Sequence, residues 1–165
     1  SGLQDRFGRG LRAAPDGATR HERCTVLLTD LFDPIALAEA AAAAAWAGLS
    51  TVDRGALAAA ALRRLGRECP ALLARPDPGA ANILRRRETP AGLRVTTQLP
   101  ATDGTGSVLI WTLAPGPGGG WRARDLVADG RSIAAALRAE FEAALAAREG
   151  DARRAIADLG GEARR

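Results

Sequence analysis

The chain has 165 residues and a formal net charge of +4, and 47% of its residues are apolar but only 4% aromatic. This length allows one substantial hydrophobic core and is too short for two ordinary domains. All basic residues are arginine, and they are spread along the chain without a basic block that alternates with aromatics, so the composition does not favour a nucleic-acid-binding protein. No segment is long and apolar enough to predict a membrane-spanning helix.

The N-terminal part of the chain predicts little regular structure. Residues 1–18 are rich in Gly, Arg and Asp, and we expect a loosely ordered lead-in there, followed by a single domain over residues 19–165. A first helix is expected from about Thr19 to Leu31. Asp33 and Pro34 then form an N-cap with proline at the first helical position, which predicts a second helix to about Ala47.

A third helix is predicted after Ser50. Ser50 and Asp53 have the spacing of a capping box, with Asp in place of the usual Glu. Proline restricts the residue before it, so this helix is expected to end at Cys69–Pro70. Within it, apolar residues recur at helical spacing at Leu57, Ala61, Leu62 and Leu65.

The pattern then changes to short extended runs that are separated by loops rich in Pro and Gly. The DGTG and GPGGG segments each connect one expected strand to the next. A phosphate-binding loop lies between a strand and a helix, so these segments are more typical of turns. The runs predict a four-stranded antiparallel meander. Its expected strands are Ala81 to Glu88, Leu93 to Leu99, Ser107 to Leu113 and Trp121 to Ala128.

Two further helices are predicted at the C-terminus. Ser132 is a good N-cap for a helix that stops at Gly150, and Asp151 can cap a short final helix to Leu159. The expected fold class is therefore α+β, with about five helices packed on the sheet. The apolar face of the longer C-terminal helix carries Ile133, Leu137, Phe141 and Leu145.

Few residues suggest catalysis or metal binding. The only histidine, His21, lies among charged residues, which is more typical of a surface position than of a general base. With Cys24 and Cys69 it cannot supply four zinc ligands at known spacings, so we expect no metal and no cofactor. Asp125 and Asp129 could form a carboxylate pair on one side of the sheet, although solvent-facing or capping aspartates are commoner.

Arginine runs allow two interpretations. Arg85, Arg86 and Arg87, like Arg63 and Arg64, most simply form a solvated face of the molecule. The functional alternative is contact with an anionic headgroup or with an acidic partner surface.

Two stretches of the sequence carry a family resemblance. One has a Trp, an Asp four residues later, a Gly-x-Ser turn and a helix with Arg and then Phe: Trp121, Asp125, Gly130, Ser132, Arg138 and Phe141. The other has a Phe-Asp opening, a later Trp and a helix start that contains Ser and Arg: Phe32, Asp33, Trp46, Ser50 and Arg54. In order and spacing, about residues 25 to 160 resemble the MlaC family, also called the toluene-tolerance auxiliary proteins.

The resemblance implies an NTF2-like twisted sheet with a pocket for acyl chains. It also implies a periplasmic shuttle, with no enzymatic step, that carries a phospholipid, hopanoid or sterol-like lipid between the membranes. The implied partners are an inner-membrane ABC or RND-type lipid transporter and an outer-membrane lipoprotein, and the protein is expected to be a monomer. A carrier is needed because about sixteen methylenes exposed to water cost on the order of 13 kcal/mol.

The expected pocket lies between the sheet and the helices, although each lining residue could equally be ordinary core. Its candidate lipid-binding residues are Phe32, Leu37, Trp46, Leu57, Leu65, Val95, Val108, Ile110, Val127, Ile133, Leu137 and Phe141. Asp125, Ser132 and Arg138 are expected to be structural polar groups near the Gly130 turn. Leu57 and Ala61 stand where the family has Phe, which predicts a wider pocket unless the core collapses.

Two other functions remain open at this point. One is an NTF2-like enzyme that uses Asp125 as a cavity carboxylate, and the other is a protein-interaction module that holds no ligand. The even number of cysteines and the exported setting that the resemblance implies predict a disulfide between Cys24 and Cys69, and two separate buried thiols are the alternative that the sequence leaves open.

Overall fold

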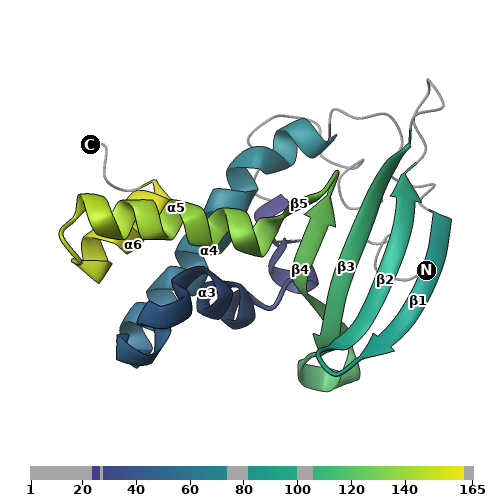
Figure 1. The fold of residues 1–165 in the computed structure, drawn as a ribbon, viewed down its shortest axis with the longest axis horizontal. Helices are drawn as coiled ribbons and strands as arrows, with labels where there is room; N and C mark the ends of the chain where they lie inside the picture. The colour runs from purple at the N-terminus through teal and green to yellow at the C-terminus, as the bar shows by residue number, and fades with distance from the viewer. Residues whose placement is uncertain (1–23, 27, 74–81, 100–105, 162–165) are drawn as a thin grey trace.

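The structure is a computed structural model that describes residues 24–26, 28–73, 82–99 and 106–161. A curved antiparallel sheet lies beside a group of helices, which gather at the β4 side of the sheet (Figure 1). The strand order is β1-β2-β3-β4-β5, so the α+β class and the predicted meander are confirmed. The lead-in predicted over 1–18 lies outside the described residues.

The four predicted strands all form, each close to its expected bounds. A fifth strand of two residues was not predicted, because it is too short to show an alternating pattern. The strands are β1 (Asn82–Thr89), β2 (Gly92–Leu99), β3 (Ser107–Pro115), β4 (Trp121–Ala128) and β5 (Arg131–Ser132).

Gly92 permits the tight turn between β1 and β2. Its φ of 126° is a backbone conformation that other residues rarely adopt. A Cβ atom at this position would lie 2.1 Å from the carbonyl oxygen of Leu113, so the neighbouring strand leaves no room for a side chain. The first hairpin therefore requires glycine here.

Two short segments pair with the outer edge of β4. Phe32 forms a parallel bridge with Ala123, and the backbone N–H of Asp33 donates to the Ala123 carbonyl at 2.8 Å. Farther along the strand, Val127 pairs with Ser132 of β5. Strand β4 is thus joined to both helical parts of the chain. Strand β1 forms the opposite edge of the described sheet.

In the first half of the chain, two of the predicted helices end at other residues than expected. Of the helix expected over 19–31, residues 24–26 and 28–31 are helical, and the rest lies outside the described residues. Helix α3 (Pro34–Ala42) begins as predicted, since the Asp33 carboxylate accepts from the Ala36 N–H at 3.1 Å. It ends before Ala47, and a 3-10 helix, η1 (Ala43–Gly48), follows.

At Ala43, where φ is 45°, the helix breaks, and the next helix contacts the segment that follows. A run of alanines favours a continuous α-helix by propensity alone. In the structure, however, the guanidinium of Arg54 donates to the Trp46 carbonyl through Nε and Nη2, at 3.2 and 3.0 Å. The same guanidinium lies 4.9 Å from the centre of the Trp46 ring. The Arg54 side chain of α4 therefore stabilises the 3-10 conformation of η1.

Helix α4 (Thr51–Leu73) starts at the predicted capping box and continues past its predicted end. The Asp53 N–H donates to Ser50 Oγ at 3.1 Å, and the Ser50 hydroxyl donates to Asp53 Oδ2 at 2.6 Å. The helix includes Pro70, where we expected it to stop. The Ala and Leu residues that follow are strong helix formers and add one more turn, so the expected end was wrong.

The C-terminal helices, α5 (Ile133–Ala147) and α6 (Ala152–Gly160), begin at the predicted caps. Ser132 Oγ accepts from the Ala135 N–H at 3.0 Å, and Asp151 Oδ1 accepts from the Arg154 N–H at 3.1 Å. Helix α5 packs against α3, and α6 packs against α4. Since α3 also packs on α4, and α5 on α6, the four helices form one bundle around a shared core.

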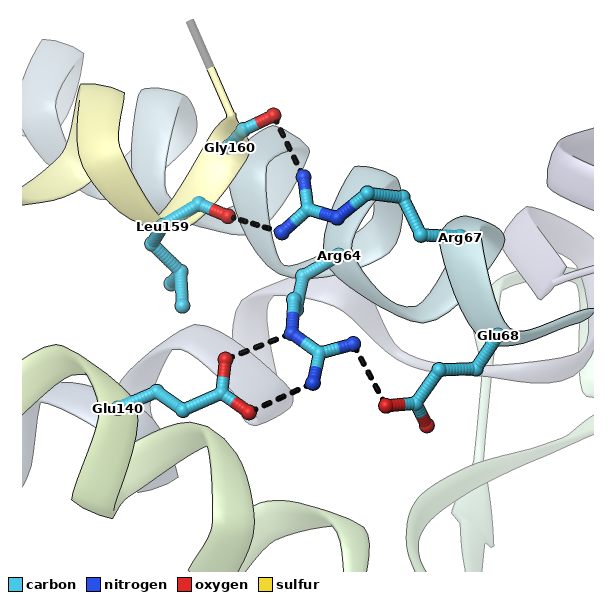
Figure 2. A network of polar contacts seen from close by, with 6 residues as sticks. All are labelled: Arg64, Arg67, Glu68, Glu140, Leu159 and Gly160. Carbon is cyan, nitrogen blue, oxygen red and sulfur yellow. Dashed lines mark hydrogen bonds and ion pairs between the residues drawn. The ribbon is translucent and has the colours of Figure 1, made fainter. Parts of the chain in front are cut away.

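Two arginines of α4 connect this helix to α5 and α6 (Figure 2). Arg64 donates to both carboxylate oxygens of Glu140 on α5, at 2.6 and 2.8 Å, and pairs with Glu68 at 2.7 Å. Its hydrogen bond to Glu140 raises the pKa of the Arg64 guanidinium, which stays charged at every working pH. Arg67 donates to the last carbonyls of α6, those of Leu159 and Gly160, at 2.9 Å each.

Candidate functional site

The apolar side chains of the helices meet one face of the sheet in a single core. Leu109 of β3 and Leu126 of β4 belong to this core, and α5 and α3 lie against β4. Trp46 and Ile133 are partly buried and pack against it. The candidate lipid-binding residues that lie fully inside this core are Phe32, Leu37, Leu57, Leu65, Leu137 and Phe141.

Strand pairing decides which candidates in the sheet face the helices. Val95 is paired directly with Trp111, and Thr97 with Leu109, so these residues share one face, which we call the helix-facing face. Val95 is buried on this face but lies beyond the contiguous core of the helices. Among the four strand candidates, only Val95 therefore lies on the side of the predicted pocket.

Val108, Ile110 and Val127 lie on the opposite face of the sheet. Ile110 is paired with Thr96 and with Val127, and these positions alternate with the helix-facing residues along each strand. Val108 is 41% exposed. Because successive side chains of a strand point to opposite faces, these three candidates point away from the helices. They are not part of the site between the sheet and the helices.

Four residues that were not among the predicted candidates lie on the helix-facing face. Strand β3 is apolar in both phases, so its own pattern does not show which side is inward. Strand β2 does show it, because apolar Leu93 and Val95 alternate with Arg94 and polar Thr96. If the alternation of inward and outward residues in β2 is carried over to the strands that pair beside it, the inward residues are Leu109, Trp111, Leu113 and Leu126.

One polar pair lies on the helix-facing face. Thr97, which is 2% exposed, is the buried polar residue of the described chain, and Trp111 Nε1–H donates to its Oγ1 at 3.1 Å. Within the described ranges, every buried side-chain nitrogen or oxygen has a hydrogen-bond partner. Where the sheet meets the helices, the described buried side chains therefore offer apolar surface, and their buried polar atoms are all paired, which suits a hydrocarbon ligand.

The Asp125 carboxylate has a structural environment. Its Oδ1 accepts from the N–H groups of Leu126 and Ala134, at 2.8 and 3.0 Å, and its Oδ2 accepts from the Ser132 hydroxyl at 2.8 Å. Asp129 lies in the exposed turn that follows β4. The two aspartates do not form a shared site, and Asp125 acts as a cap at the start of α5, the role that disfavours a catalytic carboxylate.

Arg138 lies apart from Asp125. Its Nε donates to the carbonyl of Ala40 at 3.1 Å, which connects α5 to α3. Trp121, at the start of β4, is 44% exposed. Arg138 thus stabilises a contact between two helices and does not join Asp125 in a shared site.

Cys24 is fully buried and disulfide-bonded. The side chain of Cys69 lies outside the described residues, so the predicted pairing of the two stays a prediction. Among the residues that the structure describes, no group of three or more His, Cys, Asp or Glu side chains could hold a metal ion. No described helix is long and apolar enough to cross a membrane.

Comparison with known proteins identifies the fold. No family model matches the chain, and no curated protein matches its sequence. Among solved structures, it is similar to the phospholipid-binding protein from Ralstonia solanacearum, which was solved in complex with a phospholipid. The TM-score is 0.71 at 13% sequence identity, and the match covers 97% of this chain and 89% of the other. The two chains share a fold over nearly their whole length.

Proposed function

We propose that this protein is a lipid carrier that shields the acyl chains of a phospholipid-like molecule between the helix-facing face of the sheet and the helices. The observation that carries the proposal is the shared fold, over 97% of the chain, with a protein that binds phospholipid. The apolar wall supports it, because the buried polar side chains of the described residues are already paired with one another or with the backbone.

The chemistry of this wall favours a lipid over a polar ligand. Transfer of each methylene from water to an apolar site is favourable by about 0.8 kcal/mol, whereas a polar group buried without a partner costs about 1–3 kcal/mol. Leu109 and Leu126 of the sheet belong to the same core as Leu137 and Phe141 of α5, and Trp111 packs against this core. The apolar side chains of these residues would make favourable contacts with a hydrocarbon chain.

We further propose that the protein acts as a periplasmic shuttle of the MlaC type. In this role it takes a phospholipid, hopanoid or sterol-like lipid from one membrane component and delivers it to another, and it needs no catalytic residue. The disulfide at Cys24 supports an exported location, since disulfides persist mainly in oxidising compartments. Transport partners of the ABC or RND type and an outer-membrane lipoprotein belong to this proposal.

Lipid extraction from the purified protein tests the binding function. We expect mass spectrometry to find a lipid with acyl chains or fused rings in a near-stoichiometric amount. Protein stripped of lipid should take up a fluorescent phospholipid from vesicles and return it to acceptor vesicles that lack it. A purified protein that contains no lipid and takes up none from vesicles would overturn the proposal.

A further inference from the structure

Three arginines lie together on the face of the sheet that points away from the helices. Arg85 and Arg87 are two residues apart on β1 and so point to the same side, and Arg87 is paired directly with Arg94 of β2. Arg85 is paired with Thr96, which belongs to that same outer face. All three arginine side chains are exposed, and we call this group the arginine face.

The pairing of Arg87 with Arg94 is unfavourable for the isolated protein. Like charges directly opposite each other on neighbouring strands repel and destabilise the pair. In the described part of the chain, no carboxylate forms an ion pair with Arg85, Arg87 or Arg94. The protein therefore maintains a local concentration of positive charge that its own described residues do not neutralise.

The nearest acidic residues are not placed to relieve this charge. Glu88 is paired with Leu93 and so lies on the helix-facing side of the sheet. Asp125 is on the outer face but two strands from Arg94, about 10 Å away by strand spacing, and its oxygens already accept three hydrogen bonds. Within the described ranges no carboxylate compensates the arginine face, so these side chains are available to an external anion.

Exposed aliphatic side chains accompany the arginines. Leu84, at the irregular position of β1, is 55% exposed, and Val108 of β3, on the outer face, is 41% exposed. Arginine can reach lipid phosphates with its planar guanidinium, while nearby aliphatic groups rest against the acyl boundary. A protein interface of good affinity would instead be expected to show exposed aromatic residues, and the described part of β1 and β2 contains none.

We propose that the arginine face docks the protein transiently on the surface of an anionic phospholipid membrane. Mobile anionic headgroups can gather around closely spaced arginines without a fixed complementary shape. Each arginine near an anionic leaflet strengthens binding roughly fivefold, so three give an interaction that remains reversible and weakens as salt is added. This docking is separate from the proposed lipid site, because the two lie on opposite faces of the sheet.

Sedimentation with vesicles tests the docking. The probes are vesicles of phosphatidylcholine alone and vesicles of phosphatidylcholine and phosphatidylglycerol in equal parts, at low salt. We expect the protein to bind the second kind and not the first, and the variant Arg85→Gln/Arg87→Gln/Arg94→Gln to lose roughly a hundredfold in binding. The thermal midpoint of this variant should not fall, since the substitution removes a repulsive pair.

A matched control separates the arginine face from net charge. The variant Arg131→Gln/Arg153→Gln/Arg154→Gln removes the same charge from exposed positions on β5 and α6, where two of the arginines form weak surface ion pairs. It should bind the anionic vesicles nearly as well as the unmodified protein. Equal loss in both variants, or no preference for the anionic vesicles, would overturn the proposal, and the second result would favour an acidic protein as the partner. Failure of the proposed lipid-carrier function would show differently, as vesicle docking without lipid uptake.

Discussion

The Asp125 carboxylate on β4 accepts a hydrogen bond of 2.8 Å from the hydroxyl of Ser132, the N-cap of α5. The other oxygen of the same carboxylate accepts from the Ala134 N–H in the first turn of that helix. One side chain thus fastens the start of α5 to the sheet. Since Leu137 and Phe141 follow on the buried side of α5, this contact helps to set where the helical wall of the proposed lipid site lies.

Removal of the Asp125 carboxylate should lower the stability of the fold. Asp125→Ala leaves two backbone N–H groups and one hydroxyl without their acceptor, and hydrogen bonds to a charged group contribute about 1.5–3 kcal/mol. We expect the free energy of unfolding to fall by about 2 kcal/mol in urea titration. Glu142→Ala, which removes an exposed carboxylate from α5, is the control and should change it little. Equal stability of the two variants would contradict the structural role.

The Arg64–Glu140 pair should couple α4 to α5 measurably. Its two hydrogen bonds are short, but the Glu140 side chain is 39% exposed, so solvent screening limits the gain. A double-mutant cycle of Arg64→Ala and Glu140→Ala should give a coupling energy of about 1 kcal/mol that decreases at high salt. The control cycle pairs Arg64→Ala with Glu68→Ala, whose side chain is 60% exposed, and should give less. A larger coupling to Glu68 would contradict this ranking.

A charge at Leu137 tests the placement of the lipid. Leu137 is 2% exposed, and we expect Leu137→Asp to remain folded and to lose its bound lipid, because a carboxylate in the wall excludes an acyl chain. Ala139→Asp adds the same charge at an exposed position on the same helix and should keep the lipid. Circular dichroism and lipid mass spectrometry provide the two measurements. An unfolded Leu137→Asp variant would show ordinary core at this position, and a folded one that keeps its lipid would equally contradict the placement.

Replacement of Ala61 measures the volume available near α4. Ala61 is fully buried where the family that the chain resembles has Phe. If the missing ring leaves room for lipid, Ala61→Phe should remain stable and hold less lipid, or a shorter one. If the core has closed instead, overpacking should cost about 1–3 kcal/mol. Ala59→Phe, at an exposed position of α4, controls for helix propensity, and the two variants are compared by thermal unfolding and lipid extraction.

The disulfide should link Cys24 to Cys69 and contribute strongly to stability. The loop would enclose about 45 residues, which corresponds to about 4 kcal/mol in the chain-entropy description. Thiol titration of the unreduced, denatured protein should find no free thiol, and Cys24→Ala and Cys69→Ala should lower the unfolding free energy by similar amounts. Dimers that disappear on reduction would show that Cys24 pairs between chains instead.

Elements with local signals can be predicted from the amino-acid sequence alone. Asp33, Ser132 and Asp151 were recognised as helix caps because each cap hydrogen bond spans only three residues, so no distant contact is needed to predict it. The four main strands were found for a similar reason, since turn residues rich in Gly and Pro separate them. Burial of Leu137 and Phe141 also followed from helical spacing along α5.

The side of the sheet that faces the helices and the break in the alanine run are visible only in the packing of the elements. Val108 and Leu109 are both apolar, and nothing in β3 alone distinguishes them; its pairing with β2 turns Leu109 inward and leaves Val108 exposed. The segment that follows the break at Ala43 is held by Arg54, which contacts Trp46 from the next helix. Alanine and continuous apolar strands permit several packings of similar local energy, so contacts between residues far apart in the chain choose among them.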